Sequence, residues 1–382
     1  MAVVNFNISS EQQLLLEEVN ALACGWMAPA AEQSGEAGEK LFFDGLITSL
    51  AEHKLLTPTV PQHYGGRGLG YFSTALVLEE LGALCTSVAT VVTANIHAAS
   101  PIILAGSTKQ KETFLPPLAC GKTHLAAFAL TEPEAGSDIT AIATKAYRKD
   151  NQWVINGVKE FVINGGLAHF TTLFATTDAK GKRASLVAII IPKDINGLKI
   201  GAVYDKMGIE YVRTTKLILE DVSVPGELAI GPRGSAYLLL MQTFDRGRAL
   251  AGAVGVGLAR AAYEFALQYS KRRHQFGRPV FTQQAVSFAL AELAAKIESA
   301  RLMVWKACWL IDNDMDYTMA SSMAKIAGSQ VAQEATAMAM DICGGRGYLK
   351  DWPVEKYLRD ARVLSLIEGT NNIQKAVIAS LL

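Results

Sequence analysis

Near its end, residues 359–374 of this chain of 382 residues read Arg-Asp-Ala-Arg-Val-Leu-Ser-Leu-Ile-Glu-Gly-Thr-Asn-Asn-Ile-Gln. Glu368 has no acidic neighbour there, because it follows the apolar run 363–367 and precedes Gly369 and Thr370. The helical period breaks at this point, so the carboxylate is free to enter a cavity. Apolar walls would strip its hydration, raise its pKa and make it a better proton acceptor. We therefore predict a base at Glu368, although an isolated Glu before Gly-Thr more often closes or caps a helix.

Length and composition favour a multidomain protein that acts on a small molecule. The chain is longer than one ordinary hydrophobic core supports, and its 36 basic residues balance 36 acidic ones. This balance argues against nucleic acid or an anionic membrane surface as the main partner. The five cysteines form no Cys-x-x-Cys pair, so we predict neither disulfides nor a metal site, and a cytoplasmic location. Residues 81–108 lack charge, but His97 and Pro101 are among the residues that interrupt them, which favours a buried core helix over a membrane span.

The hydrophobic period changes twice along the chain, which divides it into three parts. Helical periodicity covers residues 10–121 and returns from residue 235, with long bundle helices expected over 286–311 and 317–342. Between them the period is two, with strands expected at 153–155, 158–163, 171–177, 184–191 and 215–224, and with Asn156-Gly157 as a hairpin turn. We predict an α+β fold with an N-terminal helical domain (1–122), a middle antiparallel β domain (123–232) and a C-terminal helical bundle (233–382).

Two glycine-containing segments need separate interpretations. The glycines of residues 252–257 lack the spacing and the preceding strand of a dinucleotide fingerprint, so we interpret them as points where helices approach closely. Residues 128–138 read Phe-Ala-Leu-Thr-Glu-Pro-Glu-Ala-Gly-Ser-Asp. Their hydroxyls, exposed amides and small residues suit a loop that wraps a polar, ring-bearing cofactor, although an ordinary turn has the same composition.

Five motifs, taken in order, resemble the acyl-CoA dehydrogenase family. They are Thr131-Glu-Pro-x-Ala-Gly-Ser-Asp138, Asn164-Gly-Gly166, Arg273-His-Gln-Phe-Gly-Arg-Pro279, Gly344-Gly-Arg-Gly-Tyr348 and Glu368-Gly-Thr370. The resemblance covers essentially the whole chain and implies that family's fold, with a four-helix bundle as the C-terminal domain. It also implies FAD-dependent oxidation of a short, medium or branched-chain acyl-CoA to the trans-2-enoyl-CoA, with electrons passed to an electron-transferring flavoprotein.

The same resemblance assigns Glu368 as the catalytic base. Some branched-chain and long-chain members place their base on a different helix, at a position that is Gly247 here. In the family's mechanism the base removes the α-proton of the thioester while the β-carbon passes a hydride to the flavin. Donors to the thioester oxygen stabilise the developing enolate, an electrostatic effect worth several kcal/mol.

Binding residues are also implied by the resemblance. The flavin would be lined by Phe128, Leu130, Thr131, Gly136 and Ser137, bordered by Phe161 and Ile163, and approached by Asp341, Gly344, Gly345, Thr370 and Asn372. The substrate would contact Ser137, Asp245, Arg248, Glu368 and Gly369, with Asp245 and Arg248 at the CoA arm unless they form only a local helix salt bridge. The FAD of a neighbouring subunit would be reached by Arg273, Gln275, Phe276 and Gln284, with Arg273 donating to the pyrophosphate. A homotetramer, built as a dimer of dimers, is therefore implied.

Several residues depart from the family pattern and leave the substrate open. Ile163 replaces a common Thr or Ser, Phe161 a Trp, Ile367 a Tyr and Asp341 a Gln, while Arg213 adds a positive charge that we expect to form a surface salt bridge. The alternatives are dehydrogenation of a carrier-protein-bound acyl thioester, oxygen as the acceptor, or a flavin-binding subunit without catalytic activity. The missing hydroxyl at Ile163 supports the last alternative, and the presence of Glu368 argues against it.

Overall fold

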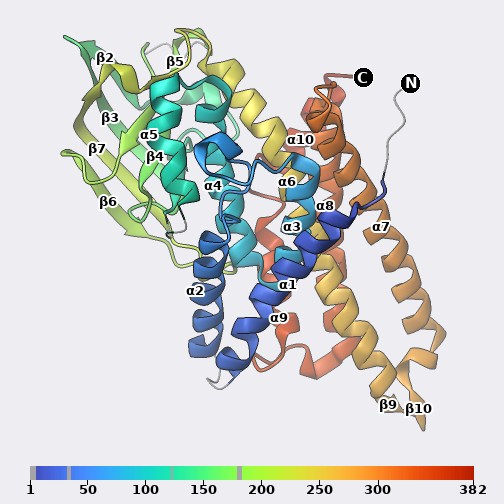
Figure 1. The fold of residues 1–382 in the computed structure, drawn as a ribbon. Coiled ribbons are helices and arrows are strands. Elements are labelled where there is room, and N and C mark those ends of the chain that lie inside the picture. Colours follow the sequence, from blue (N-terminus) through green and yellow to red (C-terminus); the bar gives the residue numbers. More distant parts are fainter. Residues whose placement is uncertain (1–5, 32–35, 121, 123, 179–182) are drawn as a thin grey trace.

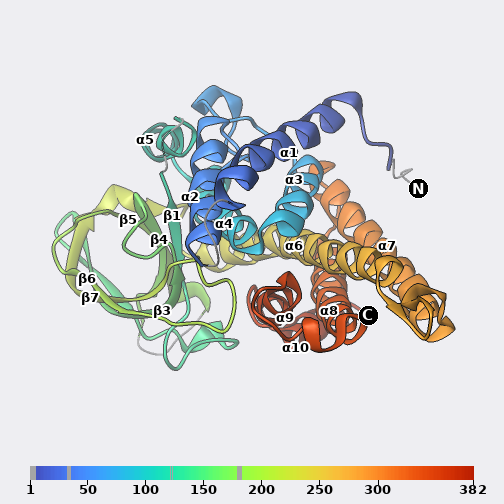
Figure 2. The same cartoon turned by 90° about the horizontal axis from the view of Figure 1, so that it is seen from below.

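Along the chain, a helical part, a β-sheet and a second helical part follow one another in the computed structural model, which describes residues 6–31, 36–120, 122, 124–178 and 183–382 (Figure 1). Seen from below, the sheet lies to one side and the long C-terminal helices extend away from it (Figure 2). The α+β fold expected from the sequence is therefore confirmed. The boundary predicted between residues 122 and 123 touches positions 121 and 123, which lie outside the described residues.

The described residues of the N-terminal part form five helices: α1 (Ser10–Ala31), α2 (Glu36–Glu52), α3 (Tyr71–Leu84), α4 (Thr86–Ala105) and α5 (Thr108–Ala119). The uncharged run of residues 81–108 is largely buried, as predicted, but a break at Cys85 divides it between α3 and α4. Both α4 and the later helix α6 (Ala236–Arg272) are long and apolar enough to cross a membrane by length and composition alone, yet most of each is buried within the protein.

The middle part is one mixed sheet with the strand order β6-β7-β3-β2-β4-β5-β8, and β1 pairs with β4. The strands are β1 (Ala126–Ala129), β2 (Lys145–Lys149), β3 (Gln152–Ile163), β4 (Phe170–Thr176), β5 (Leu186–Pro192), β6 (Leu198–Val203), β7 (Thr214–Pro225) and β8 (Ala229–Ile230). Most neighbours are antiparallel, as predicted, whereas β1 and β2 run parallel to β4.

The hairpin predicted at Asn156-Gly157 is wrong. Strand β3 runs through both residues, and its register against β7 shifts between Ile155 and Gly157, which marks a bulge. The Asn156 side chain exchanges two hydrogen bonds with Asp221, at 2.9 and 2.8 Å. Tertiary pairing with β7 therefore uses the turn-prone residues to bend a continuous strand.

Helices return in the C-terminal part: α6, α7 (Gln284–Asp312), α8 (Thr318–Cys343), α9 (Pro353–Val363) and α10 (Asn371–Ala379), with the hairpin β9 (His274–Gln275) and β10 (Arg278–Pro279) between α6 and α7. Short 3-10 turns lie at Gln62–Tyr64, Ile139–Ala141, Arg183–Ser185, Gly226–Leu228, Val280–Thr282 and Gly344–Arg346. A Cβ on Gly255 would lie 2.4 Å from the carbonyl oxygen of Gly328. The predicted close approach of helices at residues 252–257 is therefore confirmed, between α6 and α8.

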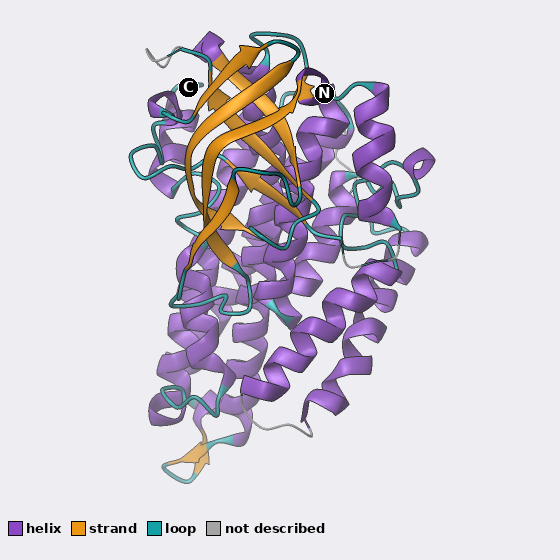
Figure 3. Cartoon of the chain, turned by 90° about the vertical axis from the view of Figure 1, so that its left-hand side faces the viewer, coloured by secondary structure: helices purple, strands orange, loops and turns teal. Residues whose placement is uncertain are grey.

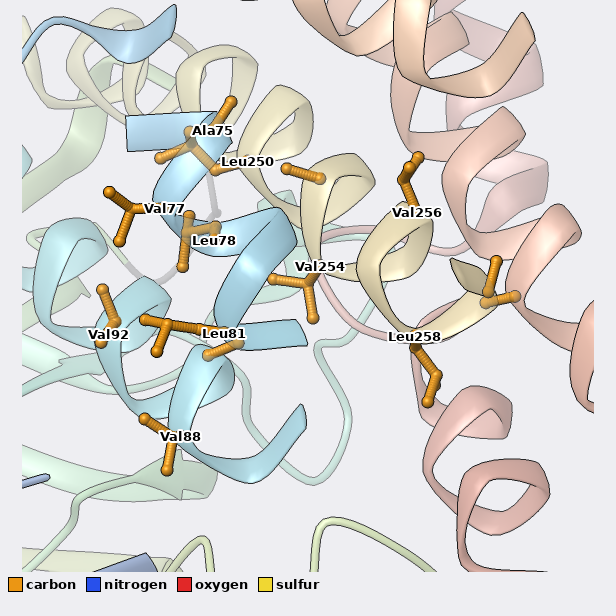
Figure 4. Packing of buried hydrophobic residues seen from close by; sticks show 14 of the residues in the cluster. Ala75, Val77, Leu78, Leu81, Val88, Val92, Leu250, Val254, Val256 and Leu258 are labelled. Carbon is orange, nitrogen blue, oxygen red and sulfur yellow. The ribbon is translucent and has the colours of Figure 1, made fainter. Parts of the chain in front are cut away.

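The largest core joins α3, α4 and α6, where Leu78, Leu81 and Val254 are among the buried side chains shown in Figure 4. Each such side chain contributes about 1.5–3 kcal/mol when it leaves water. A second core lies where α4 and α5 meet the sheet, and there the Thr172 hydroxyl of β4 donates to the carbonyl of Ala98 in α4 at 2.7 Å. Helix α4 thus packs against α3 and α6 on one side and against α5 and the sheet on the other.

Candidate active site

The loop between α9 and α10 holds Glu368 in a left-handed conformation, with φ of 59°. This conformation is uncommon for a residue with a side chain. The buried Gln374 side chain donates to the carbonyls of Glu368 and Gly369, at 3.0 Å each, and Lys325 Nζ donates to the Gly369 carbonyl at 2.9 Å. Because Thr370 caps α10 by accepting from the Ile373 N–H, Glu368 itself does not cap that helix. Its side chain points inward and remains only 16% exposed.

Opposite Glu368 lies a histidine of α4. The Nε2 atom of His97 is 2.9 Å from Glu368 Oε2, so the two side chains form an ion pair when the ring is protonated. The Phe128 ring of β1 approaches the imidazole edge-on, with 6.0 Å between ring centroids. Helix α4, strand β1 and the loop after α9 therefore meet at the carboxylate, so the site lies where the three parts of the chain meet.

These neighbours reverse the pKa shift expected for Glu368. Burial does raise the pKa of the carboxyl, but His97, followed by Lys325 and Arg248, outweighs burial and holds it below the usual range. For His97, burial lowers the pKa, and the negative charge of Glu368 more than compensates, so the net shift is upward. The expectation of a raised carboxyl pKa among apolar walls is wrong, because the walls carry cations.

Asp245 and Arg248 form a buried pair one helical turn apart on α6, with 2.5 Å between Asp245 Oδ1 and Arg248 Nη1. Asp245 Oδ2 also accepts a hydrogen bond from the Thr318 hydroxyl at 2.9 Å. Burial raises the pKa of Asp245 in spite of the guanidinium. The local salt bridge is therefore real and lies beside Glu368, while the predicted contact of this pair with the CoA arm stays a prediction.

A second buried ion pair, between Glu132 of the loop after β1 and Lys159 of β3, holds this loop in place. Lys159 Nζ lies 2.6 Å from Glu132 Oε1 and donates to the Leu130 carbonyl at 2.8 Å. Glu132 also accepts from the N–H groups of Ala143 and Thr144, at 2.7 and 3.0 Å. Burial lowers the pKa of Lys159 to about 8 despite the carboxylate. Glu132 thus has a structural role within the loop, while Glu134, Gly136, Ser137 and Asp138 are exposed.

The residues predicted to line the flavin differ in their exposure to solvent. Leu130 is buried, Phe128, Thr131 and Ile163 are half-buried, and Gly136, Ser137 and Phe161 are exposed. Open space surrounds the positions where Gly136, Gly344 and Gly345 would carry a Cβ. An exposed aromatic face, hydroxyl donors and backbone without side chains fit a flat, polar ring system with a phosphate arm.

The residues predicted to serve a neighbouring subunit lie far from Glu368. Arg273, Gln275, Phe276 and Gln284 surround the β9–β10 hairpin, which Figure 3 shows at the end of the molecule opposite the sheet. Phe276 is 94% exposed. Beside it is an open cleft of about 910 Å³ whose lining includes Arg260, Arg272, Arg273, His274, Arg346 and Trp352, and also Glu80 and Glu264. The four arginines outnumber the two glutamates, and Glu368 is not among the lining residues.

The remaining predicted residues lie at helix ends. Asp341 is exposed near the end of α8, with Gly344 and Gly345 just after it. Thr370 caps α10, and Asn372 is exposed in its first turn. The ion pairs among the described residues include Glu210 with Arg359 but none with Arg213, whose predicted surface salt bridge is therefore absent from that part of the chain.

Sequence reasoning missed His97 and Lys325, both of which are buried beside Glu368. Lys325 is the lone charged residue of the first half of α8, among small residues, and a buried cation there is a signal for an anionic partner. His97 was noted only as an interruption of an apolar helix. No local pattern relates it to a glutamate 271 positions later.

Three family models match the chain consecutively: the N-terminal domain of acyl-CoA dehydrogenase at residues 9–122, its middle domain at 127–222 and its C-terminal domain at 237–382. The chain belongs to the acyl-CoA dehydrogenase family. Its members are flavoprotein oxidoreductases that act on CH–CH bonds. The family membership inferred from five short motifs is therefore confirmed.

Individual acyl-CoA dehydrogenases resemble the chain over nearly its full length. The probable acyl-CoA dehydrogenase YngJ of Bacillus subtilis (strain 168) is 39% identical over 98% of this chain and 99% of that protein. The mitochondrial short-chain specific acyl-CoA dehydrogenase of Rattus norvegicus is 36% identical over 96% of this chain and 89% of that protein. The structure of butyryl-CoA dehydrogenase from Megasphaera elsdenii superposes with a TM-score of 0.92 at 34% identity, covering 99% of both chains.

Proposed function

We propose that this protein dehydrogenates the α,β-bond of a short, medium or branched-chain acyl-CoA to give the trans-2-enoyl-CoA, with Glu368 as the base. The observation that carries the proposal is the buried carboxylate held by a left-handed turn at the junction of α4, β1 and α6. A carboxylate in a fixed position with little water around it can remove a weakly acidic proton from a bound thioester. The similarity to short-chain and butyryl-CoA enzymes supports an acyl-CoA substrate.

The loop after β1 and the neighbouring end of β3 carry residues that suit FAD. Thr131 and Ser137 carry hydroxyl donors, Gly136 leaves room for close approach, and Phe161 presents an exposed aromatic face. FAD, when bound, supplies the two-electron acceptor that takes the β-hydrogen as hydride. The contribution of the chain is to bind and orient the thioester and to exclude water from the carboxylate.

Lys325 and Arg248 add positive charge close to Glu368, as their lowering of its pKa shows. Fixed cations close to a developing negative charge stabilise it without reorganisation. Arg248 is already paired with Asp245, whereas the hydrogen bonds of Lys325 go to neutral oxygens, those of Gly369 and Asn371. Lys325 is therefore the cation with more charge left to act on the substrate.

Assembly into a homotetramer, as a dimer of dimers, belongs to the same proposal. The basic cleft with Arg273 and the exposed Phe276 lies far from the chain's own base and is suited to the pyrophosphate and adenine of a neighbour's cofactor. Electron-transferring flavoprotein is the acceptor that we expect, and the cytoplasm is the location.

Anaerobic bleaching of the bound flavin tests the proposal. Purified protein should be yellow, and straight-chain acyl-CoAs of increasing length, branched acyl-CoAs and carrier-protein acyl thioesters are added one at a time. Bleaching by CoA esters is expected. Bleaching by carrier-protein thioesters alone would show that the substrate is a carrier-protein-bound acyl group rather than an acyl-CoA. Bleaching by none of the thioesters would favour the flavin-binding subunit without catalytic activity. Rapid reoxidation of the bleached flavin in air would favour oxygen as the electron acceptor.

A further inference from the structure

His97 has hydrogen-bonding geometry that fixes which ring atom faces Glu368. Its Nδ1 lies 3.0 Å from the carbonyl oxygen of Thr93, one turn earlier on α4. A carbonyl oxygen only accepts, so Nδ1 carries a hydrogen. The other ring nitrogen, Nε2, is therefore the atom that gains or loses a proton, and it lies 2.9 Å from Glu368 Oε2.

Two bases at this distance share one proton. If Nε2 and the carboxylate were both deprotonated, a ring lone pair would face a negative oxygen, and if both were protonated, an imidazolium would be buried without its counter-ion. The pair therefore carries a single proton, and the raised pKa of His97 together with the lowered pKa of Glu368 places it on the imidazole. The pair titrates as a unit, and its apparent pKa values belong to both groups.

Packing against α6 and β1 restricts the position of the ring. A Cβ on Gly247 of α6 would lie 1.8 Å from His97 Nε2 and 2.3 Å from its Cε1, so only glycine leaves room for this imidazole. The ring side chain is 4% exposed, and the Phe128 ring of β1 covers its edge. His97 is therefore held against Glu368 by α4, α6 and β1 together.

Other charged groups around the pair come from α6 and α8. Arg248 and Asp245 of α6 neutralise each other at 2.5 Å. Lys325 of α8 donates to the Gly369 carbonyl and to Asn371 Oδ1, at 2.9 Å each, and burial lowers its pKa to about 8. Lys325 is thus the one nearby group, among the described residues, whose titration overlaps with that of the pair and must be separated from it by experiment.

We propose that His97 is a positioning residue and proton partner of Glu368: it holds the carboxylate in the resting site and receives, at Nε2, the proton that Glu368 takes from the substrate. This inference rests on the proposed function of Glu368 as the base and extends it. The dehydrogenating form is then the pair without its proton, and the resting pair is equivalent to the state after proton transfer.

The proton balance has two steps. The α C–H bond breaks, its electron pair stays with the substrate, and the proton forms an O–H bond on Glu368. That O–H bond then breaks as an N–H bond forms at Nε2, which leaves the carboxylate paired with imidazolium, as in the resting structure. Release of the Nε2 proton to solvent after the product leaves restores the active form. Dehydrogenation therefore requires a pH high enough for the His97–Glu368 pair to lose its proton.

Substrate-free protein gives the first test. The six histidines are labelled with carbon-13 at Cε1, and the His97 resonance is identified by its loss in His97→Gln. Its midpoint should lie above about 6.5, the ordinary value for histidine, and should fall by about one pH unit or more in Glu368→Gln. Gly247→Ala should displace the ring and lower the midpoint in the same direction. Equal midpoints in the wild type and Glu368→Gln would refute the pairing.

The second test is the pH dependence of kcat/KM, which reports the free enzyme. The acid limb of the wild type should coincide with the His97 midpoint. His97→Gln keeps an amide donor facing Glu368 but cannot take a proton, so the acid limb of its kcat/KM profile should move to lower pH by about one unit or more. His97→Leu should also have a lower kcat. Lys325→Arg keeps a charge that does not titrate here and should leave the limb in place.

The two hypotheses fail differently. If no acyl thioester reduces the wild-type flavin, the proposed function fails. The titration of His97 in substrate-free protein still tests whether His97 and Glu368 are paired. If acyl-CoAs reduce the flavin but the limb is the same in His97→Gln, or moves in Lys325→Arg, the proton-partner role of His97 is wrong and the proposed function stands.

Discussion

Glu368 was predictable from the sequence because a local signal marks it. The apolar run ends at the acid, and glycine follows, which is what a left-handed turn requires. Its electrostatic environment was not predictable, because His97 and Lys325 reach it from α4 and α8. Local patterns show where a chain must turn, but only the packed structure shows which charges the turn meets.

Replacing Glu368 with Gln should leave the flavin bound and almost abolish its reduction. General base catalysis contributes about 100- to 10,000-fold, and an amide cannot accept the α-proton. The measurement is the anaerobic stopped-flow rate of flavin bleaching at saturating substrate. Glu368→Asp keeps the carboxylate on a shorter side chain and is the control. Its bleaching rate should fall between the rates of the wild type and Glu368→Gln. A rate within threefold of the wild type in Glu368→Gln would assign the base elsewhere.

The His97–Glu368 pair should also give stability a characteristic pH window. The raised pKa of His97 means that its contribution is complete below 6.5 and is lost as the pH rises through the folded value. The lowered pKa of Glu368 means that its contribution is complete above 4.5 and is lost as the pH falls through the folded value. The excess stability of the wild type over His97→Leu should therefore peak between about pH 4.5 and 6.5 and decrease on both sides.

Thermal unfolding of the two proteins across pH 4 to 9 measures this difference. Each tenfold change in proton affinity on folding corresponds to about 1.4 kcal/mol. His63→Leu, at an exposed position in the N-terminal part, is the control and should show no such peak. A difference between wild type and His97→Leu that does not vary with pH would contradict an ionised pair.

Single elements were predicted well where one hydrophobic period runs without interruption. Helix α7 spans Gln284–Asp312 around the stripe expected over residues 286–311, and the glycines of α6 meet α8 as expected. Asn156-Gly157 failed because the same residues that favour a tight turn also favour a bulge. Only the partner strand β7, more than fifty residues later, decides between the two outcomes.

The ion pair beneath the loop after β1 should be essential to that element. Lys159→Met leaves the Glu132 carboxylate buried without its cation, and the loss of one partner of a buried pair costs about 3–5 kcal/mol. Urea unfolding followed by circular dichroism measures the loss. The matched control is Lys199→Met, because the Lys199–Glu220 pair links strands of the same sheet in solvent and is worth about 0–1 kcal/mol. Equal losses in the two variants would show that the buried pair has no special role.

At the scale of the whole molecule, the chain separates two sets of ligand-binding residues. Glu368 lies where α4, β1 and the loop after α9 meet, whereas the β9–β10 hairpin lies at the end of the molecule opposite the sheet (Figure 3). Family motifs identified both sets, but sequence alone could not place them at opposite ends. That separation follows from α6, in which the 26 positions from Gly247, beside His97, to Arg273 span about 39 Å at about 1.5 Å per residue.

Arg273→Ala should therefore weaken the holoprotein without disturbing the base. If the hairpin of one subunit completes the cofactor site of another, loss of this guanidinium removes a bidentate donor to pyrophosphate and should lower the FAD retained after gel filtration by about tenfold or more. Dissociation of the tetramer at low protein concentration is expected as well, and far-ultraviolet circular dichroism should be unchanged. The control is Arg278→Ala, a change in the same hairpin on an exposed side chain that pairs with Gln283, which should retain FAD. Full cofactor content in Arg273→Ala would mean that each subunit binds its FAD without help from this residue of its neighbour.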